Sequence, residues 1–203
     1  MREVNWIIGI DDGYFPHSYK GMKGVAPIVA VLGYKALIRD LELATVVVDS
    51  GGLEVVITRM IRSLISRSRD INIPLVVTDS VIFAGFSIYD PRRVYDEAHI
   101  PIAPIFSHSI DLERIYLALK KHFKDYEERY AVIDKIYRNS TVIKTPRGWL
   151  RIYCLGIEQK KCSDIIIENQ TTHKYPQPLR TADLVASAIG KYLSASSQES
   201  VEE

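Results

Sequence analysis

Four acidic residues fall at places in the sequence where their carboxylates could meet in the folded chain. Asp11 and Asp79 each end an apolar run that is typical of a buried strand. Glu54 opens a predicted helix after a Gly-Gly turn, and Asp183 lies in the first turns of the last predicted helix. If the two strands are adjacent and parallel, Asp11 and Asp79 emerge at the same edge of the sheet. Carboxylates gathered there repel one another unless cations neutralise them, and such oxygen ligands suit Mg²⁺ or Mn²⁺.

Each of these acids also has an ordinary structural explanation. Acids often end strands as turn formers, and an acid in the first turn of a helix interacts favourably with the helix dipole. Their joint placement is harder to explain in this way than the placement of any one of them. Two divalent ions held between carboxylates are a standard arrangement for in-line cleavage of a phosphodiester bond. The pattern therefore indicates a metal-dependent hydrolase that acts on phosphodiester bonds.

The apolar patterns predict the elements that would position these acids. Strands are expected at residues 4–10, 26–34, 44–49, 74–78 and 100–106, and two prolines in the fifth strand favour a place at the sheet edge. Residues 141–144 and 149–155 form a predicted hairpin, and helices are expected at residues 53–67, 112–124, 159–169 and 176–193. This order indicates an α/β fold in one domain, residues 1–193, followed by a polar and frayed tail at residues 194–203.

Two of the predicted helices carry a single apolar stripe that would face the sheet. The stripe of the first helix consists of Leu53, Val56, Ile57, Met60, Ile61 and Leu64. The stripe of the last helix consists of Leu184, Val185, Ala188, Ile189 and Tyr192. We expect both sets of side chains to be buried against the sheet.

Composition excludes several classes of protein. The chain has 26 basic and 25 acidic residues and a net charge of +1, which excludes a strongly basic nucleic-acid coat protein but not a nucleic-acid enzyme. Cys154 and Cys162 form no C-x-x-C motif, so we expect two packed thiols and no zinc site. No apolar run approaches the ~20 residues of a membrane helix. We expect a cytoplasmic protein with no membrane partner, and the sequence gives no support for a homo-oligomer.

Three basic or aromatic side chains lie where nucleic acid would approach the acids. Lys20 and Lys23, in the loop after Asp11, are placed to contact a phosphate backbone. Tyr14, in the same loop, could stack on a displaced base, although packing within the loop is the more common fate of such an aromatic residue. His173 is the histidine placed to approach the metals, but a surface loop is the favoured interpretation.

Three stretches of the sequence resemble an archaeal family of endonuclease-V-like proteins, described as endonuclease dU and acting on deoxyuridine in DNA. These stretches are GIDDGYF at residues 9–15, TDSVIFAGF at residues 78–86 and PQPLRTADL at residues 176–184. The similarity spans roughly residues 7 to 193. The resemblance implies a ribonuclease-H-like α/β fold, in which helices flank a mixed sheet of five or more strands as in endonuclease V.

The resemblance also implies the residues of the site. The implied catalytic and metal-binding set is Asp11, Glu54, Asp79 and Asp183, with Asp11 bridging two Mg²⁺ or Mn²⁺ ions. Asp12 and Asp49 are further candidates, and Asp49 could take the place of Glu54. Arg180, in the last motif, joins the predicted nucleic-acid contacts. The implied activity is endonucleolytic cleavage of DNA that carries a deaminated base, in DNA repair.

The sequence departs from the family pattern at three places. Gln177 replaces the usual acid of the last motif, Ser80 replaces the glycine that usually follows the fourth-strand acid, and residues 105–108 lack the common basic residues. These departures keep two other functions open. One is a catalytically weak or inactive relative that binds nucleic acid, and the other is a structure-specific ribonuclease.

Overall fold

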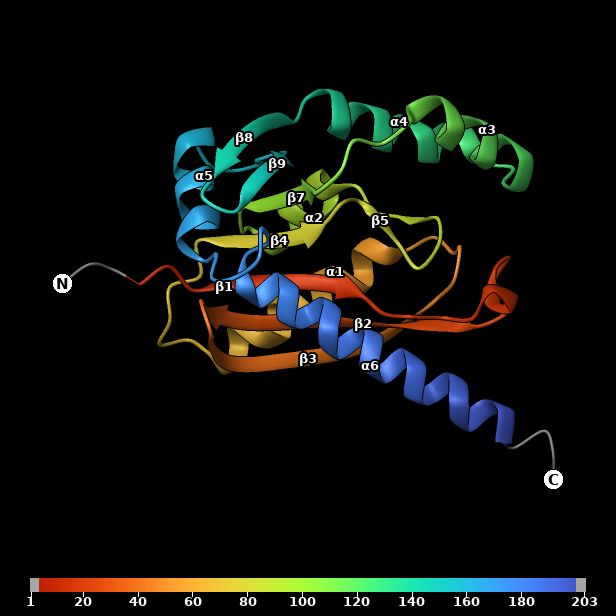
Figure 1. The fold of residues 1–203 in the computed structure, drawn as a ribbon, viewed down its shortest axis with the longest axis horizontal. Helices are drawn as coiled ribbons and strands as arrows, with labels where there is room; N and C mark the ends of the chain where they lie inside the picture. The colour runs from red at the N-terminus through yellow and green to blue at the C-terminus, as the bar shows by residue number, and fades with distance from the viewer. Residues whose placement is uncertain (1–3, 200–203) are drawn as a thin grey trace.

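The structure, a computed structural model, describes residues 4–199 of the chain. Its main feature is a seven-stranded sheet in the order β3-β2-β1-β4-β7-β9-β8 (Figure 1). The strands of this sheet are β1 (Ile7–Asp12), β2 (Val25–Tyr34), β3 (Leu37–Val47), β4 (Leu75–Asp79), β7 (Ile102–Phe106), β8 (Thr141–Thr145) and β9 (Gly148–Ile152). Two short strands, β5 (Ile82–Phe83) and β6 (Ser87–Ile88), pair with each other, and the 3-10 helix η1 (His17–Tyr19) lies between β1 and β2.

Helices cover both faces of the sheet. They are α1 (Leu53–Arg67), α2 (Pro91–Ala98), α3 (Leu112–His122), α4 (Tyr126–Arg138), α5 (Gln159–Glu168) and α6 (Gln177–Glu199). In Figure 1, α6 crosses in front of β1 and β2, whereas α1 lies behind the sheet. Within residues 4–199, no helix combines the length and the apolar character that crossing a membrane requires.

Strand directions make the sheet mixed. β1, β2 and β3 form an antiparallel meander, whereas β4 and β7 run parallel to β1. β9 pairs antiparallel with β7, and β8 and β9 form the predicted hairpin. The structure thus confirms the predicted α/β fold with a mixed sheet of more than five strands between helices.

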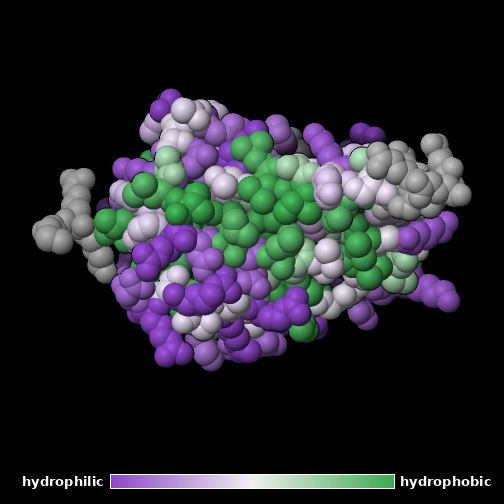
Figure 2. Space-filling view, turned by 90° about the horizontal axis from the view of Figure 1, so that it is seen from below, coloured by the Kyte–Doolittle hydropathy of each residue, from purple (hydrophilic) through white to green (hydrophobic). Residues whose placement is uncertain are grey.

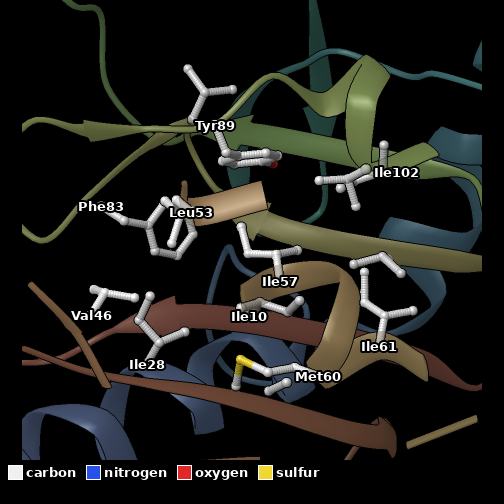
Figure 3. Packing of buried hydrophobic residues seen from close by; sticks show 14 of the residues in the cluster. Ile10, Ile28, Val46, Leu53, Ile57, Met60, Ile61, Phe83, Tyr89 and Ile102 are labelled. Carbon is white, nitrogen blue, oxygen red and sulfur yellow. The ribbon is translucent and has the colours of Figure 1, made fainter. Parts of the chain in front are cut away.

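The larger core lies between the sheet and α1. Leu53, Ile57, Met60, Ile61 and Leu64 of α1 are buried, which confirms the predicted stripe, and Val56 packs against the same core. Figure 3 shows Leu53, Ile57, Met60 and Ile61 packed among side chains of the first three strands, Ile10, Ile28 and Val46. Burying such side chains contributes about 1.5–3 kcal/mol each, so this face holds α1 firmly to the sheet.

The fifth predicted strand, β7, lies inside the sheet and not at its edge. It pairs with β4 on one side and with β9 on the other. Pro101 lies just before the strand, and the carbonyl of Pro104 accepts a hydrogen bond from Tyr153 N. The missing N–H of Pro104 therefore faces β9, where only two residues of β7 are paired in the β7–β9 ladder. The proline signal was misleading because the missing donor falls where the ladder is short.

Other local predictions were incomplete. β3 begins at residue 37 and not at residue 44, and α2 and α4 were not predicted. α2 is only eight residues long, and Asp90 caps its start by accepting a hydrogen bond from Arg92 N. Short amphipathic helices of this kind give a weak periodic signal because they complete few turns.

The two cysteines form a disulfide and are not free thiols. The Sγ atoms of Cys154 and Cys162 are 2.15 Å apart. The bond joins the chain after β9 to α5, and Cys162 is fully buried. The sequence spacing could not show this pairing, because the two residues are brought together by the turn between β9 and α5.

The last helix differs from its prediction at two points. α6 continues to Glu199, so residues 194–199 are helical, whereas residues 200–203 of the predicted tail lie outside the described residues. Leu184 and Tyr192 are 51% and 72% exposed, and Ala188 is exposed as well, so the predicted stripe is wrong at these three positions. Small residues, Ala182 and Ala186, face β2 in their place because α6 packs closely on the sheet.

Candidate active site

Asp11 and Asp79 lie side by side at the ends of β1 and β4. The parallel register pairs Ile10 with Thr78, so the next residue on each strand is one of the two acids. Ile10 and Thr78 face the α1 side, and alternation along a strand turns both acids to the α6 side. Asp11 is only 7% exposed.

α6 brings a third carboxylate, that of Asp183, to this pair. Glycines on the β1 side make the close packing possible: a Cβ atom on Gly9 would overlap the backbone of Leu179, and one on Gly13 would overlap the carbonyl of Ala186. A helix that lies against the backbone of β1 in this way holds Asp183 over the strand end. The charge of Asp183 acts on both Asp11 and Asp79.

Burial and mutual repulsion make this cluster unfavourable as three anions. Burial raises the pKa of Asp11 well above its usual range, and the carboxylates of Asp79, Asp12 and Asp183 raise it further. Burial also raises the pKa of Asp79, and the charge of Asp183 adds to this increase. The cluster is thus a place where positive charge would be stabilised.

Asp12 lies next to the cluster but points to the other face of the sheet. Its Oδ2 accepts a hydrogen bond of 2.8 Å from Ala84 N, in the FAGF stretch (residues 83–86). Burial raises the pKa of Asp12 to about 7, partly offset by this hydrogen bond. The residue therefore connects the end of β1 to the loop between β5 and β6.

Three residues that the sequence analysis did not select lie beside Asp79. Tyr175 is buried and donates a 2.7 Å hydrogen bond to Asp79 Oδ1. Lys174 donates a 3.0 Å hydrogen bond to the carbonyl of Ser107, and its charge, like that of His108, favours the ionised form of Asp79. The residues come from the α5–α6 connection and the end of β7, where no periodic pattern marks them.

His173 and Arg180 lie near Asp183. The guanidinium of Arg180 forms an ion pair with Asp183 Oδ2. His173 Nδ1 accepts a 3.2 Å hydrogen bond from Tyr175 N, and burial, with the charge of Arg180, lowers its pKa. The structure thus places His173 within the electrostatic reach of Asp183, while Arg180 occupies that carboxylate.

Asp49 and Glu54, the two alternatives for the second acid, are bound to other partners. Asp49 is buried, and its two carboxylate oxygens each accept a 2.8 Å hydrogen bond, from Gly21 N and from Phe86 N. Glu54 Oε1 accepts a 3.1 Å hydrogen bond from Asp90 N at the start of α2. Glu54 belongs to α1, so it lies on the opposite face of the sheet from Asp11.

Lys20 and Lys23 line a pocket of about 680 Å³. The pocket lies between the β1–β2 connection, the FAGF stretch and α3, and Phe86 and Phe123 form part of its wall with their rings edge to face. Tyr14 lies apart from it: its side chain is 47% exposed and its backbone packs against Gly190 of α6.

The cluster is not a preformed metal site. Among residues 4–199, no three carboxylate, imidazole or thiol groups are arranged so that they could hold one ion together. Arg180 binds Asp183, and Tyr175 binds Asp79, so protein groups supply partners for these two acids. The donors are three carboxylates that lie close together and repel one another, and such oxygen donors still suit a hard divalent cation.

A family model described as endonuclease dU matches residues 4–190. The chain belongs to the endonuclease dU family. This confirms the resemblance on which part of the sequence analysis depends. The matched residues include all three motif stretches. Membership of the endonuclease dU family supports nuclease activity for this protein.

Archaeal proteins are similar to this member of the endonuclease dU family along almost the whole chain. A UPF0215 protein from Pyrococcus furiosus is 28% identical over 197 residues, which cover 93% of each chain. Another from Sulfurisphaera tokodaii is 29% identical over 187 residues, covering 92% of this chain and 96% of the relative.

Solved structures with the same fold include endonuclease V. A protein of unknown function from Archaeoglobus fulgidus has a TM-score of 0.75 at 21% identity, covering 91% of this chain and 98% of that chain. Endonuclease V of Ciona intestinalis, in complex with DNA containing an inosine, has a TM-score of 0.62 at 11% identity, covering 95% and 89%. Human endonuclease V has a TM-score of 0.59 at 12% identity, covering 94% and 86%. The endonuclease dU family member thus has the predicted endonuclease-V-like fold.

Proposed function

We propose that this protein is an endonuclease that hydrolyses phosphodiester bonds with Mg²⁺ or Mn²⁺ as cofactor. The observation that carries the proposal is the meeting of Asp11, Asp79 and Asp183 under α6, where burial and repulsion raise the pKa of two of the acids. Membership of the endonuclease dU family supports the same activity. Mutually repelling buried carboxylates have no evident structural benefit, which favours a catalytic role.

The carboxylates of Asp11, Asp79 and Asp183 would hold the cofactor. Binding would remove the protons that the raised pKa values favour, and it would require Asp183 to leave Arg180. A divalent ion bound there supplies an activated water and stabilises the charge of the leaving oxygen. Glu54 and Asp49 are not part of this proposal because each already accepts backbone hydrogen bonds elsewhere.

Other side chains of the chain would orient the acids and the substrate. The hydroxyl of Tyr175 holds the carboxylate of Asp79 in one orientation. Lys174 and His108 place positive charge beside Asp79, where a substrate phosphate would approach. Arg180, once released from Asp183, becomes a further phosphate contact on the same side of α6.

The proposed substrate is DNA that carries a deaminated base such as deoxyuridine. The family description supports it, and so does the DNA containing inosine in the similar structure of Ciona endonuclease V. The pocket of about 680 Å³ is lined by the aromatic residues Phe86 and Phe123 and by Lys20 and Lys23. The aromatic rings suit one displaced base, and the two lysines suit the adjoining phosphate.

Cleavage of defined oligonucleotides tests the proposal. Duplexes with one deoxyuridine, with one deoxyinosine or without damage are incubated with the wild type and with Asp79→Asn, with Mg²⁺, with Mn²⁺ or with a chelator. We expect metal-dependent cleavage of a damaged duplex, reduced at least about 100-fold in the variant, since changing even an outer partner of a metal ligand costs 10–100-fold. Equal activity, or equal inactivity, of the two proteins would contradict the proposal.

A second candidate function is binding of nucleic acid without efficient cleavage. The Arg180–Asp183 ion pair and the lack of three converging donors among the described residues favour it. Under this alternative the wild type binds the damaged duplex with a similar affinity whether or not metal is present, and it does not cleave. A structured RNA included in the same assay separates the ribonuclease alternative, which requires faster cleavage of RNA than of DNA.

A further inference from the structure

The hairpin of β8 and β9 carries an exposed tryptophan. This hairpin forms the end of the sheet opposite β3 (Figure 1). Trp149 is 61% exposed, and Val142, on the same face of the hairpin, is 48% exposed. Tryptophan side chains are highly buried on average, because the indole ring is large and mostly apolar. The exposed ring of Trp149 is therefore a candidate for contact with another molecule.

Positive side chains lie beside this ring. Lys144 lies opposite Trp149 in the β8–β9 register, and its ammonium group is 5.9 Å from the centre of the ring. Arg147 is exposed at the turn between the two strands. Among the described residues, neither of these two cationic side chains forms a hydrogen bond or an ion pair. Residues 135–157 include no acidic residue, and their basic residues are Lys135, Arg138, Lys144, Arg147 and Arg151.

Hydrogen bonds fix the turn that carries Arg147. The buried hydroxyl of Thr145 donates a 2.8 Å hydrogen bond to the carbonyl of Gly148 and accepts a 3.1 Å hydrogen bond from Arg147 N. Gly148 has a φ of 124°, a conformation that residues with a side chain rarely adopt. Because this backbone is already ordered, binding to the turn costs no further ordering of a loop.

The register directs the hairpin toward the end of the sheet that carries the acidic cluster. Asp79 is level with Ile105 of β7, which is level with Ile152 of β9. β9 runs antiparallel to β7, so the residues before Ile152 extend beyond Asp79 in the direction in which β4 ends. With about 4.8 Å between strands and about 3.3 Å per residue, the backbone of Trp149 lies about 14 Å from that of Asp79, and the turn lies about 20 Å from it.

Lys174 lies between the acidic cluster and the hairpin. Ser107 follows Phe106, the last paired residue of β7, whose partner on β9 is Arg151, so Ser107 lies beside the hairpin. Lys174 Nζ donates a 3.0 Å hydrogen bond to the carbonyl of Ser107, and the charge of Lys174 acts on Asp79. Positive groups therefore continue from the strand end of Asp79 to the hairpin.

The opposite end of the sheet has a different surface. Figure 2 shows a continuous hydrophobic band on the side of β3 and α6, bordered by hydrophilic side chains. Leu41 and Leu43 of β3 are 46% and 48% exposed. A polyanion gains little from such a band, because affinity for nucleic acid comes chiefly from cations that contact phosphates. The hairpin combines an aromatic ring with cations, which is the composition of a surface that binds single strands of nucleic acid.

We propose that the β8–β9 hairpin binds an unpaired stretch of the substrate strand beside the cleaved bond. Trp149 stacks on one base, and Lys144 and Arg147 contact the adjoining phosphates. An unpaired stretch fits better than a duplex, because the faces of paired bases are covered by their neighbours in the stack. The inference rests on the proposed function, since it assigns a further part of the same substrate to the hairpin.

The hairpin and the β1–β2 connection would hold the substrate on opposite sides of the acids. In the strand order, β1 and β2 lie on one side of β4, and β7, β9 and β8 lie on the other. Lys20 and Lys23 belong to the first side and the hairpin to the second. At about 3.4 Å per stacked nucleotide, the distances of about 14–20 Å from Asp79 correspond to about 4–6 nucleotides.

The fluorescence of Trp149 tests the stacking contact. The chain has two tryptophans, so Trp6→Phe leaves Trp149 as the single indole. Trp6 precedes β1 at the other end of the sheet and packs near the ring of Tyr34. A single-stranded oligonucleotide with one deoxyuridine is added in the presence of a chelator, so that metal-dependent cleavage does not compete. We expect the indole fluorescence to fall on binding, and Trp149→Ala to weaken binding about 5- to 100-fold, as loss of a stacking ring does.

The salt dependence of binding tests the two cations. Lys144→Gln combined with Arg147→Gln removes two phosphate contacts, so the slope of log affinity against log salt should become shallower by about 1.4. The matched control is Lys160→Gln combined with Lys161→Gln, which removes the same charge at exposed positions of α5. α5 follows a residue that is bridged to the start of β7, at the other end of the sheet from the acids. The control should leave the slope unchanged.

The outcomes separate this inference from the proposed function. Unchanged fluorescence, or a salt slope that the hairpin variant does not alter or that the control alters equally, overturns the inference whether or not the protein cleaves. Quenching with a shallower slope in a protein that does not cleave supports the inference and contradicts the endonuclease proposal. Where the wild type cleaves, Trp149→Ala should raise KM and leave kcat unchanged. A dimer in light scattering that Trp149→Ala dissociates would make the hairpin a protein interface and overturn the inference.

Discussion

Two groups of buried or partly buried carboxylates lie near the same end of the sheet, on opposite faces, and their surroundings differ. On the α6 face, Asp11 and Asp79 lie together and repel Asp183 and each other. On the α1 face, Asp49 accepts two backbone hydrogen bonds, and Glu54 accepts one at the start of α2. The first group stores unfavourable electrostatic energy, whereas the second holds loops in place.

The difference separates acids that stabilise the fold from acids that cost stability. A buried carboxylate with backbone N–H partners contributes to stability, because its desolvation is compensated. A buried carboxylate that faces other carboxylates does not, and it is kept for another reason. Substitutions in the two groups should therefore move activity and stability in opposite ways.

The largest effect is expected for Asp11→Asn. Cleavage should fall at least about 100-fold, while the free energy of unfolding without divalent ions should rise by about 1 kcal/mol at pH 8, because one of the repelling charges is removed. Cleavage assays and urea unfolding in a chelator measure the two quantities. Asp164→Asn, at an exposed position of α5, is the matched control and should change neither. A loss of both activity and stability would show that Asp11 belongs with the structural acids.

The opposite pattern is expected for Asp49→Asn. This variant should lose about 2 kcal/mol of unfolding free energy, since one of the two backbone N–H groups that bind the carboxylate loses its acceptor inside the protein. Urea unfolding measures the loss. Cleavage per folded molecule, at saturating metal, should remain within a few-fold of the wild type. If activity falls as far as in Asp11→Asn while stability is unchanged, Asp49 belongs to the site.

The pH dependence of stability should distinguish the buried carboxylate of Asp12 from the carboxylates that pair with Arg67. The pKa of Asp12 is raised to about 7 in the fold, so the folded chain binds more protons than the unfolded chain between about pH 4 and pH 7. Stability without metal should therefore fall as pH rises, by about 2 kcal/mol from pH 5 to pH 7. Arg67 lowers the pKa of Asp40 and of Glu42. The stability that these two ion pairs contribute is therefore lost only at more acidic pH. Unfolding of the wild type and Asp12→Asn across this range measures the slope, which should be smaller in the variant; an unchanged slope would contradict the assignment.

The fold was largely predictable because its signals are local. The stripe of α1 and the apolar runs of β1, β2 and β4 follow from periodicity alone. The position of β7 was not predictable, because the consequence of Pro104 depends on which neighbour its nitrogen faces. The exposed Leu184 and Tyr192 were missed for a related reason: the close approach of α6 to β1 selects small residues, which a hydrophobicity pattern does not favour.

The candidate site was predictable only in part. Asp11 and Asp79 follow from two strand ends and a parallel pairing, and Asp183 follows from its motif. The role of Asp49 depends on hydrogen bonds from Gly21 and Phe86, which come from distant loops and leave no trace in spacing. Tyr175 was missed because its contact with Asp79 joins residues 96 positions apart.

The smallest effect is expected for Tyr175→Phe, which tests how the α6-face acids are oriented. The variant removes the hydroxyl that donates to Asp79 Oδ1 and keeps the ring in place. The apparent affinity for Mn²⁺ should fall about 10-fold and cleavage should fall with it, as for other groups that orient metal ligands, while stability changes by less than about 1 kcal/mol. Titration of cleavage with Mn²⁺ measures the affinity, and Tyr153→Phe is the control, because that hydroxyl has no hydrogen bond to Asp79. If saturating Mn²⁺ restores full activity, Tyr175 acts through metal binding. If Mn²⁺ affinity and cleavage are both unchanged, the prediction is wrong, because the carboxylate of Asp79 is then oriented without Tyr175.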